Sequence, residues 1–99
     1  MAADADAVYW GDTSLKTIEK WTSAGGRQML AHADPDAVVV ADGIIYWTDG
    51  FVDGSIRSIH TDGTGSKPLL CNLSRPGALF VDGSYVVTSS DVGILRLPR

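Results

Sequence analysis

Few residues of this chain stand in patterns that could do chemistry. The segment "HADPD" (32–36) places His32, Asp34 and Asp36 at alternate positions, and imidazole with carboxylates can bind several divalent ions. The same spacing around a central proline is equally typical of a turn. The segment "DGFVDG" (49–54) lacks the spaced acidic residues and the closing Glu of a calcium loop. We therefore expect no metal site and no cofactor.

Catalytic patterns are also missing from the sequence. It contains no G-x-S-x-G elbow for a nucleophilic serine and no glycine-rich phosphate loop ahead of a helix. The one cysteine, Cys71, stands beside "PLL" in a run that is typical of a buried strand. We expect that the protein is not an enzyme.

Length and charge exclude further classes of protein. The 99 residues suit one small domain. The formal charge is −4 and no cluster of basic residues occurs, although a nucleic-acid groove needs one. The beginning, "MAADADAVYW", lacks the basic and apolar regions of a signal peptide, and no segment has the length of a membrane span. We expect neither a nucleic acid nor a membrane as a partner.

Internal repeats organise the chain. "AVYWGD" (7–12) recurs as "IIYWTD" (44–49), with the Tyr-Trp pair returning after 37 positions. "VVVADGIIYWT" (38–48) recurs as "LFVDGSYVVT" (79–88), with Asp-Gly returning after 40 positions. Isoleucines spaced by 38 positions give a third correspondence: Ile18, Ile56 and Ile94. The period is therefore about 40 residues.

Each period is predicted to hold short strands. "DAVVVADG" is a β-branched run that ends in the strongest hairpin dipeptide, and "GIIYWTD" follows as its partner strand. Ile56 and Ile59 lie three apart, so a twist or a bulge is expected in the next strand. Four short strands in about 40 residues, repeated, are the pattern of a β-propeller blade. The sequence predicts an all-β, antiparallel fold of about two and a half four-stranded blades.

The strand count gives the domain organisation. Residues 1–99 form one repeat unit with a partial blade (7–31), a full blade (36–71) and a partial blade (77–97). The ten predicted strands are 7–11, 17–22, 27–31, 37–41, 44–48, 55–60, 67–71, 78–81, 84–89 and 93–97. Such a chain can close a ring only by oligomerisation or as part of a longer chain. If the first blade lacks its first strand, a junction between copies duplicates two strands and each copy supplies two blades, so two to four copies would close a ring.

The motif resembles a known family. "IYWTD" (45–49) contains the signature of the YWTD repeats, which are the class B repeats of low-density lipoprotein receptors, and "VYWGD" (8–12) differs from the four letters YWTD by one substitution. "YVVTSS" (85–90) is similar to a decayed copy. The resemblance implies a six-bladed propeller, which favours three copies, an extracellular or cell-surface origin, and protein binding without catalysis.

Roles for the motif residues follow from the same resemblance. It implies that the Tyr-Trp pair packs within and between blades, and that the Thr and Asp hydrogen-bond backbone in neighbouring loops. The residues concerned are Tyr46, Trp47, Thr48 and Asp49, with Tyr9, Trp10 and Asp12 in the first copy.

Loops at one end of the blades form the candidate binding face. They are "DTSLK" (12–16), "AHADPD" (31–36), "DGFVDG" (49–54) and "NLSRPG" (72–77), and loops on a rigid scaffold are the usual place for binding. The candidate residues are His32, Phe51, Asp53 and Arg75. Alternatively, Phe51 covers a blade edge and Arg75 is solvated. We expect a non-catalytic module for protein binding; the alternatives are a self-assembling structural fragment and a fragment of a propeller-type lyase or hydrolase.

Overall fold

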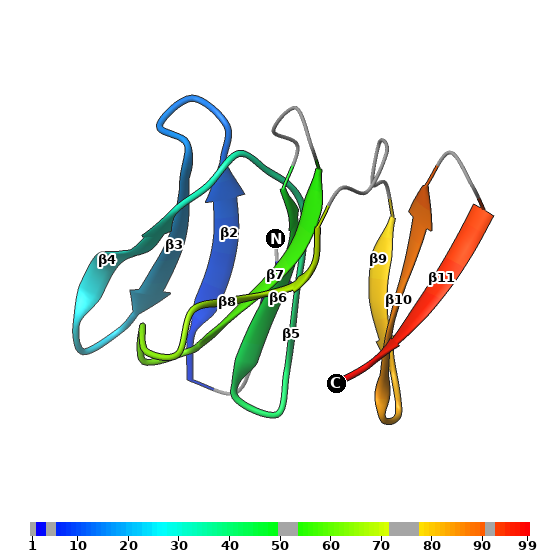
Figure 1. The fold of residues 1–99 in the computed structure, drawn as a ribbon. Helices are drawn as coiled ribbons and strands as arrows, with labels where there is room; N and C mark the ends of the chain where they lie inside the picture. The colour runs from blue at the N-terminus through cyan, green and yellow to red at the C-terminus, as the bar shows by residue number, and fades with distance from the viewer. Residues whose placement is uncertain (1, 4–5, 50–53, 72–77, 91–92) are drawn as a thin grey trace.

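Three antiparallel sheets make up the structure, a computed structural model that describes residues 2–3, 6–49, 54–71, 78–90 and 93–99. Each sheet is a meander in which strands adjacent in sequence pair, and the described residues form no helix (Figure 1). The first sheet contains β1 (Ala2–Ala3), β2 (Val8–Asp12), β3 (Thr17–Thr22) and β4 (Gly26–His32). The second contains β5 (Pro35–Ala41), β6 (Ile44–Asp49), β7 (Ser55–His60) and β8 (Lys67–Leu70), and the third contains β9 (Leu79–Asp82), β10 (Tyr85–Ser90) and β11 (Gly93–Pro98). The expected all-β fold of successive propeller-like blades is confirmed.

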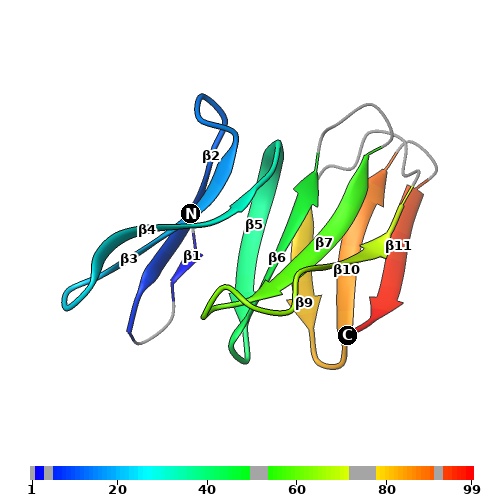
Figure 2. The same ribbon diagram turned by 60° about the vertical axis from the view of Figure 1, so that its left-hand side comes forward.

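Two apolar clusters join the sheets, with the second sheet between the other two (Figure 2). The cluster between the first and second sheets contains Ala7, Tyr9, Ile18, Ala33, Ile45, Trp47 and Ile59. The cluster between the second and third sheets contains Tyr46, Ile56, Leu79 and Val86. Side chains alternate along a strand, so the neighbours Tyr46 and Trp47 enter different clusters. Trp47 contributes only packing there, because its buried Nε1 has no hydrogen-bond partner among the described residues.

Polar contacts also link successive sheets. Lys20 of the first sheet donates from Nζ to the carbonyl oxygen of Thr61, which follows β7, over 2.9 Å. Arg99, after β11, donates from Nε to Tyr46 Oη (3.1 Å) and pairs with Asp42 Oδ2 (2.6 Å). The Tyr46 hydrogen bond and the Asp42 contact raise the pKa of Arg99 above its ordinary value. Each pair of neighbouring sheets is therefore held together by an apolar cluster and by a cationic side chain.

The first sheet has one more strand than the sequence predicted. β1 pairs antiparallel with β2 through Ala2 opposite Tyr9 and Ala3 opposite Val8. The prediction that the first blade lacks its first strand is therefore wrong, and the described residues form eleven strands rather than the ten predicted. Two alanines show no alternation of apolar and polar residues, so no pattern in the sequence predicts this strand. Backbone pairing alone defines it.

The hairpin of the third sheet is displaced by one residue from that of the second. Between β5 and β6, Ala41 pairs with Ile44, and Asp42 and Gly43 both have positive φ (53° and 75°), as a type I′ turn requires. Between β9 and β10, Asp82 pairs with Tyr85, so Gly83 (φ 59°) is the first central residue, as in a type II′ turn. The predicted spacing of 40 is therefore wrong by one for β10.

Replacement of Gly83 tests this turn. We expect Gly83→Ala to destabilise the chain by about 1–2 kcal/mol, because an L-residue side chain is strained at a positive φ. Urea unfolding at fixed protein concentration measures the effect. Ser84→Ala is the matched control in the same turn, since Ser84 has no positive φ, and an equal loss in both variants would contradict the turn assignment.

Candidate binding face

A hydroxyl near the end of a strand fixes the beginning of the same sheet in two of the three sheets. Thr48 of β6 accepts a hydrogen bond at Oγ1 from the Ala37 N–H (2.9 Å), and Ser89 of β10 accepts one at Oγ from the Ala78 N–H (3.0 Å). Ser89, rather than Thr88, therefore takes the place of Thr48 in the third sheet. Sequence alignment on Asp-Gly missed this role; the turn type, with glycine in first place, is the signal that could have found it.

In the first sheet the corresponding position is Gly11, which has no hydroxyl. A Cβ atom added to Gly11 would lie 2.5 Å from Pro35 Cγ and 2.6 Å from Pro35 Cβ. Pro35 is buried at the start of β5, so it packs directly on the backbone of β2. The single departure of "VYWGD" from the motif therefore matches a steric need for glycine.

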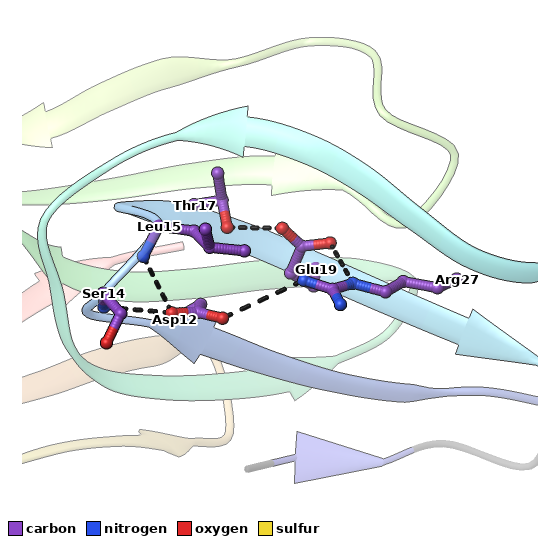
Figure 3. A network of polar contacts seen from close by, with 6 residues as sticks. All are labelled: Asp12, Ser14, Leu15, Thr17, Glu19 and Arg27. Carbon is purple, nitrogen blue, oxygen red and sulfur yellow. Dashed lines mark hydrogen bonds and ion pairs between the residues drawn. The ribbon is translucent and has the colours of Figure 1, made fainter.

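Asp12 organises the loop between β2 and β3. Its Oδ1 accepts hydrogen bonds from the backbone N–H groups of Ser14 and Leu15, each over 2.9 Å (Figure 3). The loop is joined to the next connection because the Lys16 carbonyl accepts from the Ala33 N–H (2.9 Å). The side chain of Leu15 stays 58% exposed at the loop. The result is a fixed loop that presents one apolar side chain to solvent.

Beside this loop, a buried carboxylate lies on the face of the first sheet that points away from the second sheet. Glu19 accepts hydrogen bonds from the Thr17 hydroxyl and from Arg27 Nε, the latter over 3.1 Å (Figure 3). The Arg27 guanidinium lies 6.0 Å from the centre of the Trp10 ring and 3.9 Å from Asp12 Oδ2. Burial of a carboxylate is tolerated when such partners satisfy it. This network orders the outer face of the first sheet and touches the Asp12 loop.

The structure places one of the four candidate binding residues. His32 is exposed at the end of β4, opposite Thr17, and so lies at the same end of the sheet as the Asp12 loop. Phe51, Asp53 and Arg75 lie outside the described residues. The buried Asp49 ends β6, as Asp12 ends β2. The described part of the candidate face is therefore built from loop 13–16 and the segment from His32 to Asp34.

Other residues with chemical potential are far apart. His60 is exposed at the end of β7, opposite Ile44 at the start of β6, whereas His32 lies at the other end of the sheets. Cys71 is exposed and follows the end of β8 at Leu70, so the prediction of a buried strand position for this thiol is wrong. The described part of the chain contains no group of three His, Cys, Asp or Glu residues that could hold a metal, and no helix in it could span a membrane.

The loop after β7 has an internal hydrogen-bond network. Asp62 Oδ1 accepts from both the hydroxyl (2.6 Å) and the N–H (2.9 Å) of Thr64. Donors to a carboxylate favour its charged form, so these bonds, the hydroxyl first, lower the pKa of Asp62 below its ordinary value. This network lies beside the Thr61 carbonyl that receives Lys20, so it helps to fix a contact between two sheets.

Comparison with known proteins shows the wider fold. No family model matches the chain. The structure is similar to a chain in the crystal structure of the nidogen/laminin complex, with a TM-score of 0.86 and 28% sequence identity. The match covers 98% of this chain and 42% of that one. The sequence thus spans less than half of the chain it matches, and its three sheets form part of a β-propeller-like fold.

A consensus argument would replace the glycine at the motif position with threonine to gain stability, but the structure predicts a loss of stability. Gly11→Thr restores the motif letter, but we expect it to destabilise the chain by about 1–3 kcal/mol, because the added side chain overpacks against Pro35. Chemical denaturation measures the loss. The double variant Gly11→Thr/Pro35→Ala should recover part of it, since the two residues are in contact; additive losses would contradict the steric explanation.

The Asp62 loop predicts a response to pH. Thr64→Val removes the hydroxyl donor and should raise the pKa of Asp62 toward its ordinary value of 3.8, as measured by NMR titration of the carboxyl carbon. A lowered pKa in the folded state stabilises the protein above the unfolded pKa, and this contribution disappears as pH falls through the folded pKa. The variant should therefore lose less stability on acidification. His60→Gln should change the pKa less, and the reverse order would contradict the stated cause.

Proposed function

We propose that the chain is a non-catalytic module of a YWTD-type β-propeller that binds a protein partner through the loops at one end of its sheets. The observation that carries this proposal is the Asp12 loop, in which a motif aspartate holds two backbone N–H groups and leaves Leu15 exposed. A fixed loop with an exposed apolar side chain loses little conformational entropy on binding. The motif therefore supports binding by shaping the loops.

Similarity to a solved complex supports a protein ligand. The matched chain belongs to a structure described as a nidogen/laminin complex, in which proteins contact one another. His32 lies at the same end of the described sheets as Leu15, which is the end to which the sequence-based strand order assigned the candidates Phe51, Asp53 and Arg75. A catalytic role has no comparable support, because His32 and His60 lie at opposite ends of the sheets.

Binding of laminin to the immobilised chain tests this function. We expect measurable binding by biolayer interferometry, and a loss of at least about tenfold for Leu15→Asp, because a charge would be desolvated in the contact. Asp62→Ser, at the other end of the sheets, is the control and should bind as the unchanged chain does. Absence of binding would contradict laminin as a shared partner, and equal binding by Leu15→Asp would contradict the loop face.

A second candidate function is structural self-assembly. It is favoured by large apolar side chains on outer sheet faces, since Phe80 and Ile94 of the third sheet and Trp21 and Met29 of the first are exposed. An exposed cluster of this kind marks a contact surface. In this role the chain assembles with copies of itself into a larger propeller.

A further inference from the structure

The isoleucines that repeat every 38 residues occupy the same place in each sheet. Ile18 pairs with Gly11, Ile56 with Thr48, and Ile94 with Ser89, and these partners are the three equivalent positions of the motif. Ile18 and Ile56 are 0% exposed, because each is covered by the next sheet along the chain, whereas Ile94 is 74% exposed. In the first and second sheets this surface is covered by the following sheet. The third sheet carries the same kind of surface, and there it is exposed.

The outer face of the third sheet, here called the front face, has the composition of such an interface. Phe80 and Tyr85 are exposed, and Val87 lies between Phe80 and Arg96 in the strand register. The guanidinium of Arg96 lies 4.4 Å from the centre of the Tyr85 ring. The opposite side of the same sheet, with Leu79 and Val86, already packs against the second sheet. The front face is thus a second apolar face on one sheet.

The outer face of the first sheet, here called the back face, is the complementary surface. Trp10 corresponds to Trp47, 37 positions later, and Trp21 corresponds to Ile59, 38 positions later. Trp47 and Ile59 are at most 2% exposed, because they pack against the preceding sheet, whereas Trp21 is 46% exposed. The back face therefore carries the half of the interface that, within this chain, packs against the preceding sheet.

These two free faces match the two halves of the interface that the chain forms between its own sheets. We propose that two copies of the chain pair head to tail, with the front face of each third sheet covering the back face of the other copy's first sheet. The proposal rests on the self-assembling role and specifies its partner and its contact. Head-to-tail contacts close a ring when the rotation allows it, and two copies of three sheets make six. Because β1 completes the first sheet, each copy supplies three sheets. A ring of six sheets then needs two copies of the chain, not the three copies that the sequence favoured.

A polar contact supports the same docking. Lys20 lies opposite Tyr9 and donates to the Thr61 carbonyl in the loop after β7. Arg96 lies opposite Val87 and stands 76 residues after Lys20, or two spacings of 38. Arg96 therefore places a cationic side chain at the position from which Lys20 of the first sheet contacts the second sheet. In the proposed pair it reaches the loop between β3 and β4 of the other copy.

Light scattering on a size-exclusion column, at several concentrations, tests the pairing. We expect the unchanged chain to have twice the chain mass, and Ile94→Asp and Trp21→Asp each to be monomeric with unchanged circular dichroism. Both side chains are exposed in the single chain, so the substitutions spare the folded core. Leu15→Asp is the matched control, because the exposure of Leu15 (58%) lies between those of Trp21 (46%) and Ile94 (74%) and Leu15 is in the loop between β2 and β3, on neither face; it should keep twice the chain mass.

Mixing the two monomeric variants tests the orientation. Trp21→Asp keeps a front face and Ile94→Asp keeps a back face, so an equimolar mixture should form a one-to-one pair through a single contact. A dimer of Trp21→Asp alone would overturn head-to-tail docking in favour of front-to-front contact. An oligomer insensitive to both substitutions, or one of three copies, would overturn the inference and leave self-assembly standing. A monomer or a heterogeneous mass for the unchanged chain would overturn both.

Discussion

Alternation of side chains along each strand is the constraint on which this structure depends. In a stack of sheets both faces of an inner sheet are covered, so each of its strands must supply apolar groups to two interfaces. Tyr46 and Trp47 meet this need as neighbours, one toward the third sheet and one toward the first. Ile56 and Ile59 meet it as well, because residues three apart also lie on opposite faces. The repeated aromatic pair is therefore a two-sided packing device.

The same constraint explains why much of the fold was predictable. A 40-residue period of short strands required stacked sheets, since no single sheet could bury both faces, and the structure has three. The spacing of Ile56 and Ile59 shows how far local reasoning reaches. A twist or a bulge was expected in this strand, and the register between β7 and β8 does shift between Ile56 and Arg57, but the two isoleucines still serve different clusters. Only knowledge that both faces are covered removes the need to place them together.

Details that depend on backbone geometry were harder to predict. The dipeptide Asp-Gly occurs in both hairpins. Asp42 and Gly43 occupy both central positions of the turn in the second sheet, whereas in the third sheet Gly83 occupies the first central position and the aspartate precedes the turn. This shift transfers the motif hydroxyl from Thr88 to Ser89. The need for glycine at position 11 arises from Pro35, 24 residues later and in another sheet. Such contacts leave no local pattern, and the candidate loops that contain Phe51, Asp53 and Arg75 were assigned by strand order alone.

The distribution of tryptophan has a spectroscopic consequence. Trp10 and Trp21 lie in the first sheet and Trp47 lies in the cluster between the first and second sheets, while residues 78–99 contain none. Intrinsic tryptophan emission therefore reports on one side of the molecule and does not register separation of the third sheet. Far-ultraviolet circular dichroism reports on all three sheets. Coincident transitions by the two probes would mean that the stack melts as one cooperative unit, and separated transitions would mean that its sheets come apart in sequence.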